Sequence, residues 1–72
     1  MPRDKSMEWG ALMDEYAPLV DEQREAQAIV TRGFSTGRGP TMEQIHRLEA
    51  ADRALVAFIK RKDAWLKEAL KD

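Results

Sequence analysis

Residues 41–70 carry the apolar repeat that most constrains the fold of this chain. At about 100° per residue, one face of a helix over this stretch collects positions 45, 48, 51, 55, 58, 59, 62, 66 and 69. Lys62 is the only charged residue on that face. No Gly or Pro follows Pro40, so local helix propensity agrees with the repeat. The sequence predicts one amphipathic helix over residues 41–70.

The ends of this stretch carry helix-capping signals. Thr41 is followed three residues later by Gln44, which is the spacing of a capping box. Glu43 lies in the first turn and Lys67 in the last, and both charges suit the helix dipole. The predicted helix therefore begins at Thr41 and ends close to residue 70.

A second apolar repeat precedes it. Its members recur at intervals of three and four residues and are Trp9, Leu12, Met13, Tyr16, Leu19, Val20, Gln23, Ala26 and Val30. The repeat predicts a helix over about residues 6–32, capped by Ser6 or Asp4.

Pro18 interrupts this first helix. A proline inside a helix removes one hydrogen bond and crowds the preceding turn, at a cost of about 3 kcal/mol unless the helix bends. Two interpretations follow: one helix kinked at Pro18, or a short helix that ends near Tyr16 and a second that starts at Pro18. The apolar repeat keeps its phase through the proline, which favours the kinked helix.

Residues 33–40 form the predicted turn, since three glycines and a proline in eight residues cannot continue a helix. Gly33 is expected to cap the first helix in the left-handed conformation. Phe34 is expected to fold back over the end of the helices. The loop has two interpretations: a flexible connector, which we favour, or a partner contact anchored by Phe34 and Arg38.

Charge and size together indicate an antiparallel hairpin that associates with a second copy. Residues 1–31 hold three basic and seven acidic side chains, whereas residues 42–72 hold seven basic and six acidic ones. A chain of 72 residues without cysteine has no disulfide to stabilise a small core. The fold class predicted is all-α, a single helical-hairpin domain over residues 1–72 that dimerises into a four-helix bundle. A three-helix monomer bent at Pro18 and a hetero-complex are the alternatives.

The oligomer interface is expected to use the apolar faces of both helices. Its predicted residues are Trp9, Leu12, Tyr16, Leu19, Gln23, Val30, Ile45, Leu48, Leu55, Phe58, Ile59, Lys62 and Leu66. Gln23 and an Asp52/Lys62 pair are candidates for fixing register and oligomeric state. The alternative for Lys62 is that its methylenes cover the core while its ammonium reaches solvent.

The two tryptophans are expected at one end of the hairpin. Trp9 and Trp65 lie at similar distances from the turn in an antiparallel arrangement. The sequence therefore predicts an aromatic cluster opposite the loop, with a packing role for both rings.

No motif for catalysis, cofactor binding or metal binding stands out. Glu43, His46 and Glu49 have the spacing of bundle di-iron ligands but point away from the apolar face, and we expect no metal or cofactor. A ridge of Arg53, Lys60 and Lys67 could follow a phosphate backbone, although acidic residues are interspersed and the net charge is −1.

The function expected is that of a non-enzymatic, bacterial-type and cytoplasmic interaction module, such as an adaptor, chaperone-like protein or regulatory subunit. Its expected partners are a second copy of itself and another protein. The alternative is a nucleic-acid-binding dimer that uses the basic ridge. In size and expected topology the chain is similar to Rop-type RNA-binding dimers and to small co-chaperones of type III secretion needle subunits. The likeness covers the architecture alone.

Overall fold

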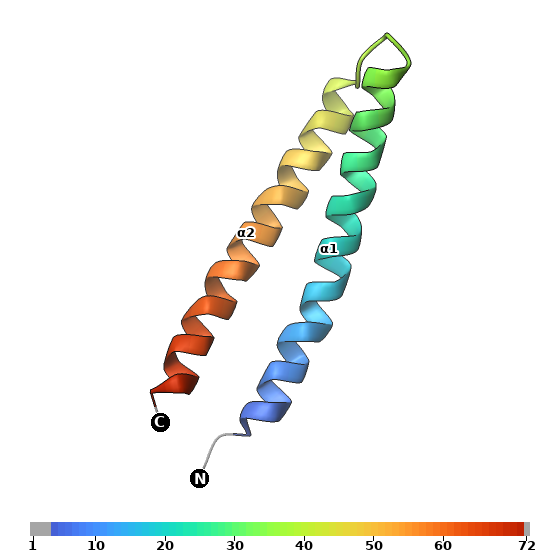
Figure 1. Cartoon of the computed structure of the whole chain (residues 1–72). Coiled ribbons are helices and arrows are strands. Elements are labelled where there is room, and N and C mark those ends of the chain that lie inside the picture. Colours follow the sequence, from blue (N-terminus) through green and yellow to red (C-terminus); the bar gives the residue numbers. More distant parts are fainter. Residues whose placement is uncertain (1–3, 72) are drawn as a thin grey trace.

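The computed structural model describes residues 4–71 and shows two long helices joined by a short loop. Helix α1 spans Lys5–Ser35 and helix α2 spans Met42–Leu70. They run antiparallel, side by side along their whole length, so both ends of the chain lie opposite the loop (Figure 1). The predicted hairpin is confirmed, and the first helix is a few residues longer at its C-terminal end than the repeat indicated.

Both helices begin at the residues that carry capping signals. Asp4 caps α1, where its side chain accepts a hydrogen bond from the Met7 amide at 3.0 Å. Thr41 and Gln44 form the predicted capping box, with distances of 3.1 Å and 2.9 Å for its two hydrogen bonds. Each cap satisfies backbone donors that the first helical turn leaves free.

Helix α1 is continuous through Pro18 (Figure 1). The interpretation with two separate helices is therefore wrong. Pro18 and Asp14 are both exposed. Pro18 removes the hydrogen bond that the Asp14 carbonyl would accept, and because both residues are exposed, water can take the place of the lost donor.

The end of α1 differs from the prediction. Gly33 lies inside the helix, which continues to Ser35 and is capped by Thr36. The left-handed residues are Gly37 and Gly39, with φ of 81° and 79°. Gly33 has a different role, because a Cβ at this position would lie 2.8 Å from the Cα of Pro40. Its missing side chain lets the returning chain pass directly over α1.

The prediction that Phe34 covers the end of the hairpin is wrong. Its side chain is 68% exposed, because the extra helical residues place it one position beyond the close contact of Gly33 with Pro40.

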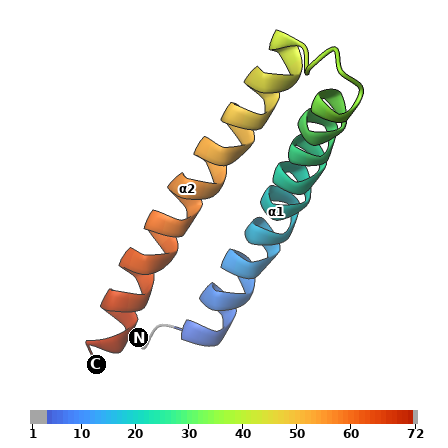
Figure 2. The same cartoon turned by 45° about the horizontal axis from the view of Figure 1, so that its top comes forward.

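The molecule is a rod. Its principal extents are 58 × 16 × 15 Å and its radius of gyration is 16.6 Å, whereas a compact chain of this length has a radius of gyration of about 11 Å. In both views the two helices stay side by side from the termini to the loop (Figures 1 and 2). With two helices and no third layer, every side chain that does not face the other helix faces solvent.

Candidate protein-interaction surface

The two helices meet along a seam whose residues alternate in steps of three and four. On α1 the seam residues are Lys5, Trp9, Leu12, Tyr16, Leu19, Gln23, Ala26, Val30 and Gly33. On α2 they are Gln44, Leu48, Ala51, Leu55, Phe58, Lys62, Trp65 and Ala69. This spacing keeps one line of each helix facing the other, as in an antiparallel coiled coil. The seam sets which residues remain on the outside.

Contacts spread along the rod fix the register of this seam. At the open end, Lys5 Nζ donates a hydrogen bond to the Ala69 carbonyl at 2.9 Å. At the loop end, Gly33 lies against Pro40. Because the helices are antiparallel, moving one residue along α1 corresponds to moving one residue back along α2. These two contacts therefore determine which α2 residue lies at the same height along the rod (the same level) as each seam residue of α1.

Two aromatic pairs fill the seam near the termini. The rings of Trp9 and Trp65 lie 5.6 Å apart, and those of Tyr16 and Phe58 lie 5.4 Å apart. The predicted tryptophan cluster opposite the loop is confirmed. Phe58 is fully buried, and the Arg61 guanidinium lies 5.6 Å from the centre of its ring. These rings supply large apolar contacts, with a favourable cation–π contact at their edge.

A polar layer separates the aromatic half of the seam from the half next to the loop. The Gln23 amide donates to Asp52 Oδ1 on α2 at 3.1 Å and to Gln27 Oε1 at 2.9 Å. The predicted Asp52/Lys62 pair does not form within one copy, and its role between copies stays a prediction. Ten residues separate the two along α2, or about 15 Å, whereas Gln23 faces Asp52 directly.

Lys62 follows the simpler of its two interpretations. Its side chain is 29% exposed and its ammonium lies 3.8 Å from Asp63 on the same helix. The aliphatic part of Lys62 lies along the seam while the charge reaches the surface beside Asp63.

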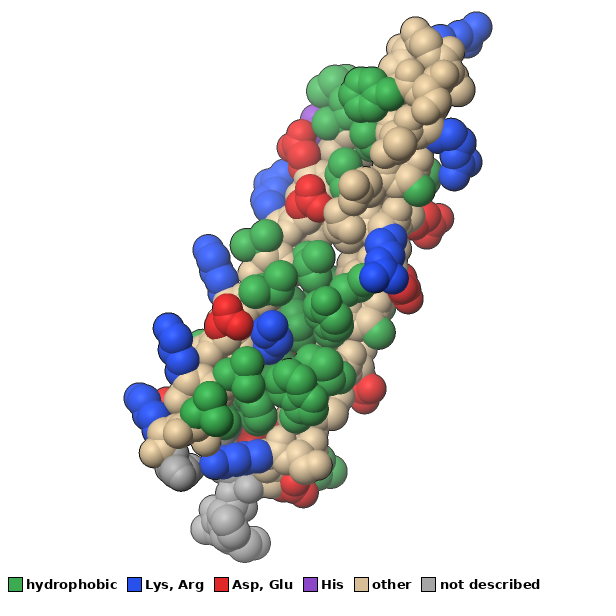
Figure 3. Space-filling view, viewed as in Figure 1, with side chains coloured by type: hydrophobic (Ala, Val, Ile, Leu, Met, Phe, Trp, Pro, Cys, Tyr) green, Lys and Arg blue, Asp and Glu red, His purple; other side chains and the backbone are tan. Residues whose placement is uncertain are grey.

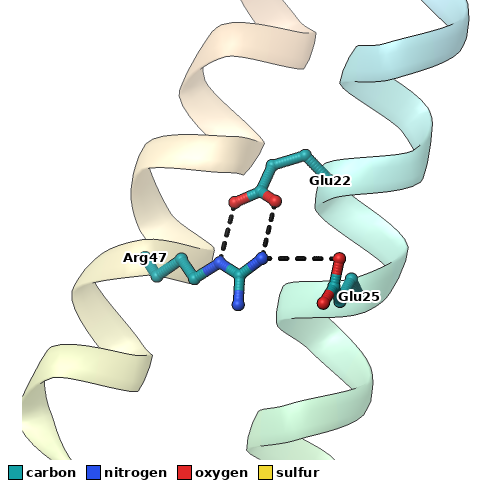
Figure 4. A network of polar contacts seen from close by, with 3 residues as sticks. All are labelled: Glu22, Glu25 and Arg47. Atoms are coloured by element: carbon teal, nitrogen blue, oxygen red, sulfur yellow. Dashed lines mark hydrogen bonds and ion pairs between the residues drawn. The ribbon is translucent and has the colours of Figure 1, made fainter.

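One long side of the hairpin, which we call the charged side, is held by ion pairs between the helices. Arg47 on α2 donates to both carboxylate oxygens of Glu22 on α1, at 2.8 Å and 2.7 Å, and lies 3.6 Å from Glu25 (Figure 4). Further along, Arg61 pairs with Glu15. The acidic first half and basic second half of the chain therefore meet across the hairpin, as their charges predicted.

The Glu22–Arg47 pair shifts the pKa of both groups. The hydrogen bonds from Arg47 lower the pKa of the Glu22 carboxyl below its ordinary value of 4.5. In return, Glu22 raises the pKa of Arg47, which is already protonated at every accessible pH. The charged side is thus satisfied within one copy of the chain.

The opposite long side, which we call the apolar side, has no such cover. It carries positions 13, 20, 27 and 34 of α1 and positions 45, 52, 59 and 66 of α2, each next to the seam. Their apolar members are Met13, Val20, Phe34, Ile45, Ile59 and Leu66. Hydrophobic side chains gather over both helices along the face of the molecule seen in Figure 3.

Seam side chains and outer neighbours extend the apolar side. Trp9 is 36% exposed and Tyr16 38%, because their rings are too large for the space between two helices. Val56 is 51% exposed and Leu70 81%, and both lie one helical turn from Ile59 or Leu66. The apolar side is therefore widest in the half of the rod near the termini.

The interface residues predicted from the sequence divide into two groups. Most belong to the seam and pack between α1 and α2; these are Trp9, Leu12, Tyr16, Leu19, Gln23, Val30, Leu48, Leu55, Phe58 and Lys62. Ile45, Ile59 and Leu66 lie on the apolar side, where a second molecule could reach them. Val56 was missed, although its position four residues after Asp52 places it beside this face.

Trp65 and Ala26 lie in the seam, although neither was among the interface residues predicted from the sequence. Ala26 is almost fully buried and the Trp65 ring faces Trp9. The 3.6-residue repeat alone defines a broad face, and only contact with the other helix selects the line along its centre.

The basic ridge lies on the outer side of α2. Arg53, Lys60 and Lys67 are all exposed, and Arg53 lies 3.6 Å from Glu49 one turn away. The three residues share one line of the helix, away from the seam and beside the apolar side.

Over residues 4–71, no group of three or more His, Cys, Asp or Glu side chains could hold a metal ion, and no helix is long and apolar enough to cross a membrane. Glu43, His46 and Glu49 are exposed along α2. Comparison of the chain with protein-family models, with curated proteins and with solved structures finds no significant match. A function is therefore inferred from the surface itself.

Proposed function

We propose that this chain is a non-enzymatic protein–protein interaction module that acts through self-association, with two hairpins joined along their apolar sides into a four-helix bundle. The observation that carries this proposal is the contrast between the two long sides. Ion pairs between the helices satisfy the charged side, whereas the apolar side exposes Trp9, Tyr16, Val56 and Ile59. A continuous apolar strip of this kind is typical of an association surface.

The surface area of the chain supports the same proposal. Its accessible surface is 5651 Å², whereas a compact monomer of its mass exposes about 4,500 Å². The excess of about 1,100 Å² exceeds the roughly 800 Å² that each partner buries in a stable interface. A second copy on the apolar side would bring the exposed area per chain close to that of an ordinary folded protein.

Association leaves outer faces of both helices free. In the bundle, the outer sides of α1 and α2 remain available for another protein, as an adaptor or regulatory subunit requires. Docking of such a partner is the second part of the proposed function.

Sedimentation velocity over a range of concentrations tests self-association. The parent chain is expected at twice 8.2 kDa. A Val20→Glu/Ile59→Glu variant places charges inside the proposed interface and should weaken association at least about a hundredfold, because each copy then buries two unpaired carboxylates. A monomeric parent at several hundred micromolar would overturn the proposal.

A matched control separates the apolar side from charge in general. The Ala28→Glu/Ala57→Glu variant adds the same two charges at exposed positions outside the seam and away from the central apolar strip. Circular dichroism should show the same helix content for both double variants, and only the apolar-side variant should dissociate. Equal dissociation of both variants would show that net charge, and not this face, controls association.

The nucleic-acid alternative has its own test. Its support is the exposed alignment of Arg53, Lys60 and Lys67, and its weakness is the ion pair that already engages Arg53 with Glu49. At low salt, a triple alanine variant of the ridge should lose binding to duplex RNA or DNA if this function exists. Absence of binding by the parent chain removes the alternative.

A further inference from the structure

The apolar side has a direction, because its polar layer is not in the middle. From the open end toward the loop it presents Leu66, Met13, Ile59 and Val20, then Gln27 and Asp52, then Ile45 and Phe34. The midpoint of α1 lies near Val20, whereas the polar layer lies closer to the loop. A second copy must therefore match this order, and its orientation matters.

Two hairpins can face each other in two symmetric ways. A two-fold axis parallel to the helices keeps both loops at one end and places α1 of each copy across from α2 of the other at the same level. A two-fold axis across the helices places the loops at opposite ends and pairs α1 with α1 and α2 with α2. The two arrangements bring different residues together.

The polar layer favours the arrangement with both loops at one end. In this arrangement the polar layer of one copy, formed by Gln23, Gln27 and Asp52, lies at the same level as that of the other copy, so amide donors and carboxylate acceptors share one layer. In the arrangement with the loops at opposite ends, a two-fold axis through the midpoint of α1 places Gln27 of one copy opposite Met13 of the other instead. Burying an amide or carboxylate against a thioether chain without a partner is unfavourable.

The charges at the edges of the apolar side favour the same arrangement. Arg24 lies at the α1 edge, is exposed, and makes no ion pair with the residues the structure describes. Glu49 lies at the α2 edge, one turn before Asp52, which contacts Gln23. Its Oε2 lies 3.6 Å from Arg53 on the same helix, and a carboxylate has further lone pairs with which to accept a second cation. Arg24 and Glu49 are thus at nearly the same level on opposite edges, so they meet between copies only when α1 lies across from α2.

We propose that the second copy lies parallel to the first, with both loops at one end, and that the polar layer and two symmetric Arg24–Glu49 ion pairs select this orientation. The inference rests on the proposed self-association and adds its geometry. One consequence is that the exposed Phe34 and the half-buried Ile45 of one copy approach those of the other beside the two loops, which extends the apolar contact past the polar layer.

A charge-swap series tests the ion pairs. Arg24→Glu alone and Glu49→Arg alone should each raise the dimer dissociation constant by about three- to thirtyfold, since each creates two like-charge contacts per dimer at exposed positions. The Arg24→Glu/Glu49→Arg double variant should return to within about threefold of the parent. Strictly additive losses in the double variant would overturn the proposed pairing.

Label distances test the orientation without changing the interface. The chain has no cysteine, so Ser35→Cys near the loop and Lys67→Cys near the open end each provide one exposed labelling site. Pulsed electron paramagnetic resonance on Ser35→Cys dimers should give about 20 to 30 Å. This is the diagonal of a two-by-two bundle whose neighbouring helices are about 10 Å apart, plus the two label arms. Lys67→Cys dimers should give a similar distance.

The mixed sample is the control. Dimers formed from one Ser35→Cys chain and one Lys67→Cys chain should give clearly longer distances, of about 45 to 50 Å, since the two sites lie about 42 Å apart along the rod. A short distance in the mixed sample, with long distances in each pure sample, would overturn the parallel arrangement while leaving self-association intact. A parent chain that sediments as a monomer would instead refute self-association itself.

Discussion

The half of the seam near the termini and the half next to the loop hold the helices together by different means. Near the termini, two pairs of aromatic rings fill a wide space. Next to the loop, Ala26, Ala51 and Gly33 let the helices approach, and a bidentate ion pair and an amide–carboxylate hydrogen bond join them.

The difference explains where surface is left for association. Large rings exceed what two helices can enclose, so the edges of Trp9 and Tyr16 remain exposed. Small residues bring the backbones close and are buried in the seam of the loop half, where the exposed apolar residues, Phe34 and Met42, lie outside the seam. The seam of the aromatic half therefore leaves more apolar edge for a second molecule than the seam of the loop half does.

The largest expected effect is at the centre of the aromatic half. Phe58→Ala should lower the free energy of unfolding by about 3 to 5 kcal/mol, because it removes a fully buried ring and leaves a cavity beside Tyr16. Val30→Ala in the loop half should cost only about 2 kcal/mol. Urea melts monitored by circular dichroism measure both, and equal costs would contradict the proposed difference between the halves.

The next largest effect is expected where the Pro40 backbone passes close to Gly33 at the loop. Gly33→Ala places a Cβ 2.8 Å from the Pro40 backbone, so the loop must shift, at an expected cost of about 1 to 3 kcal/mol. Alanine also improves helix propensity by about 1 kcal/mol, which offsets part of that cost. A melting temperature that rises in this variant would show that the loop yields without strain.

The matched glycine in the other half should respond with the opposite sign. Gly10 lies inside α1, and a Cβ at this position would meet nothing within 4 Å, so Gly10→Ala should stabilise the chain by about 1 kcal/mol. Thermal melts of the two alanine variants side by side give the comparison directly. Destabilisation by Gly10→Ala would indicate a contact at this position outside the single hairpin.

The smallest expected effect is a pH dependence of folding stability that arises from the Glu22–Arg47 pair in the loop half. The pKa of Glu22 is lower in the folded chain than its ordinary value of 4.5. The Glu22–Arg47 pair therefore contributes its full stability above about pH 4.5, and this contribution is lost as the pH falls through the lower pKa of the folded chain. Glu22→Gln should flatten the stability curve below pH 4.5. Asp14→Asn, which removes a carboxylate at an exposed position away from the seam, is the control, and Glu22→Gln should flatten the curve more than this control does.

Much of the fold follows from local sequence signals. The two repeats, the capping box at Thr41 and Gln44, and the glycines of the turn predict two helices and a hairpin, and the charges of the two halves favour their pairing. The end of α1 could not be predicted. Gly33 resembles a helix cap in sequence, yet its role depends on the approach of Pro40, which no local pattern encodes.

The candidate surface was only partly predictable for the same reason. The repeat identified a broad apolar face, including Ile45, Ile59 and Leu66, but could not separate residues that pack inside the hairpin from those left outside. The contact of Asp52 inside the hairpin was also not predicted, because Gln23 reaches it only across the folded seam.

The sequence by itself determined that the chain forms two amphipathic helices and where the turn between them lies, because helical periodicity, caps and glycines act over a few residues. Only the tertiary structure decided which line of each helix became the seam, and hence that one long side closes with ion pairs while the other stays apolar. The physical reason is that each helix carries an apolar face wider than one neighbour can cover, so the register between them determines what remains exposed.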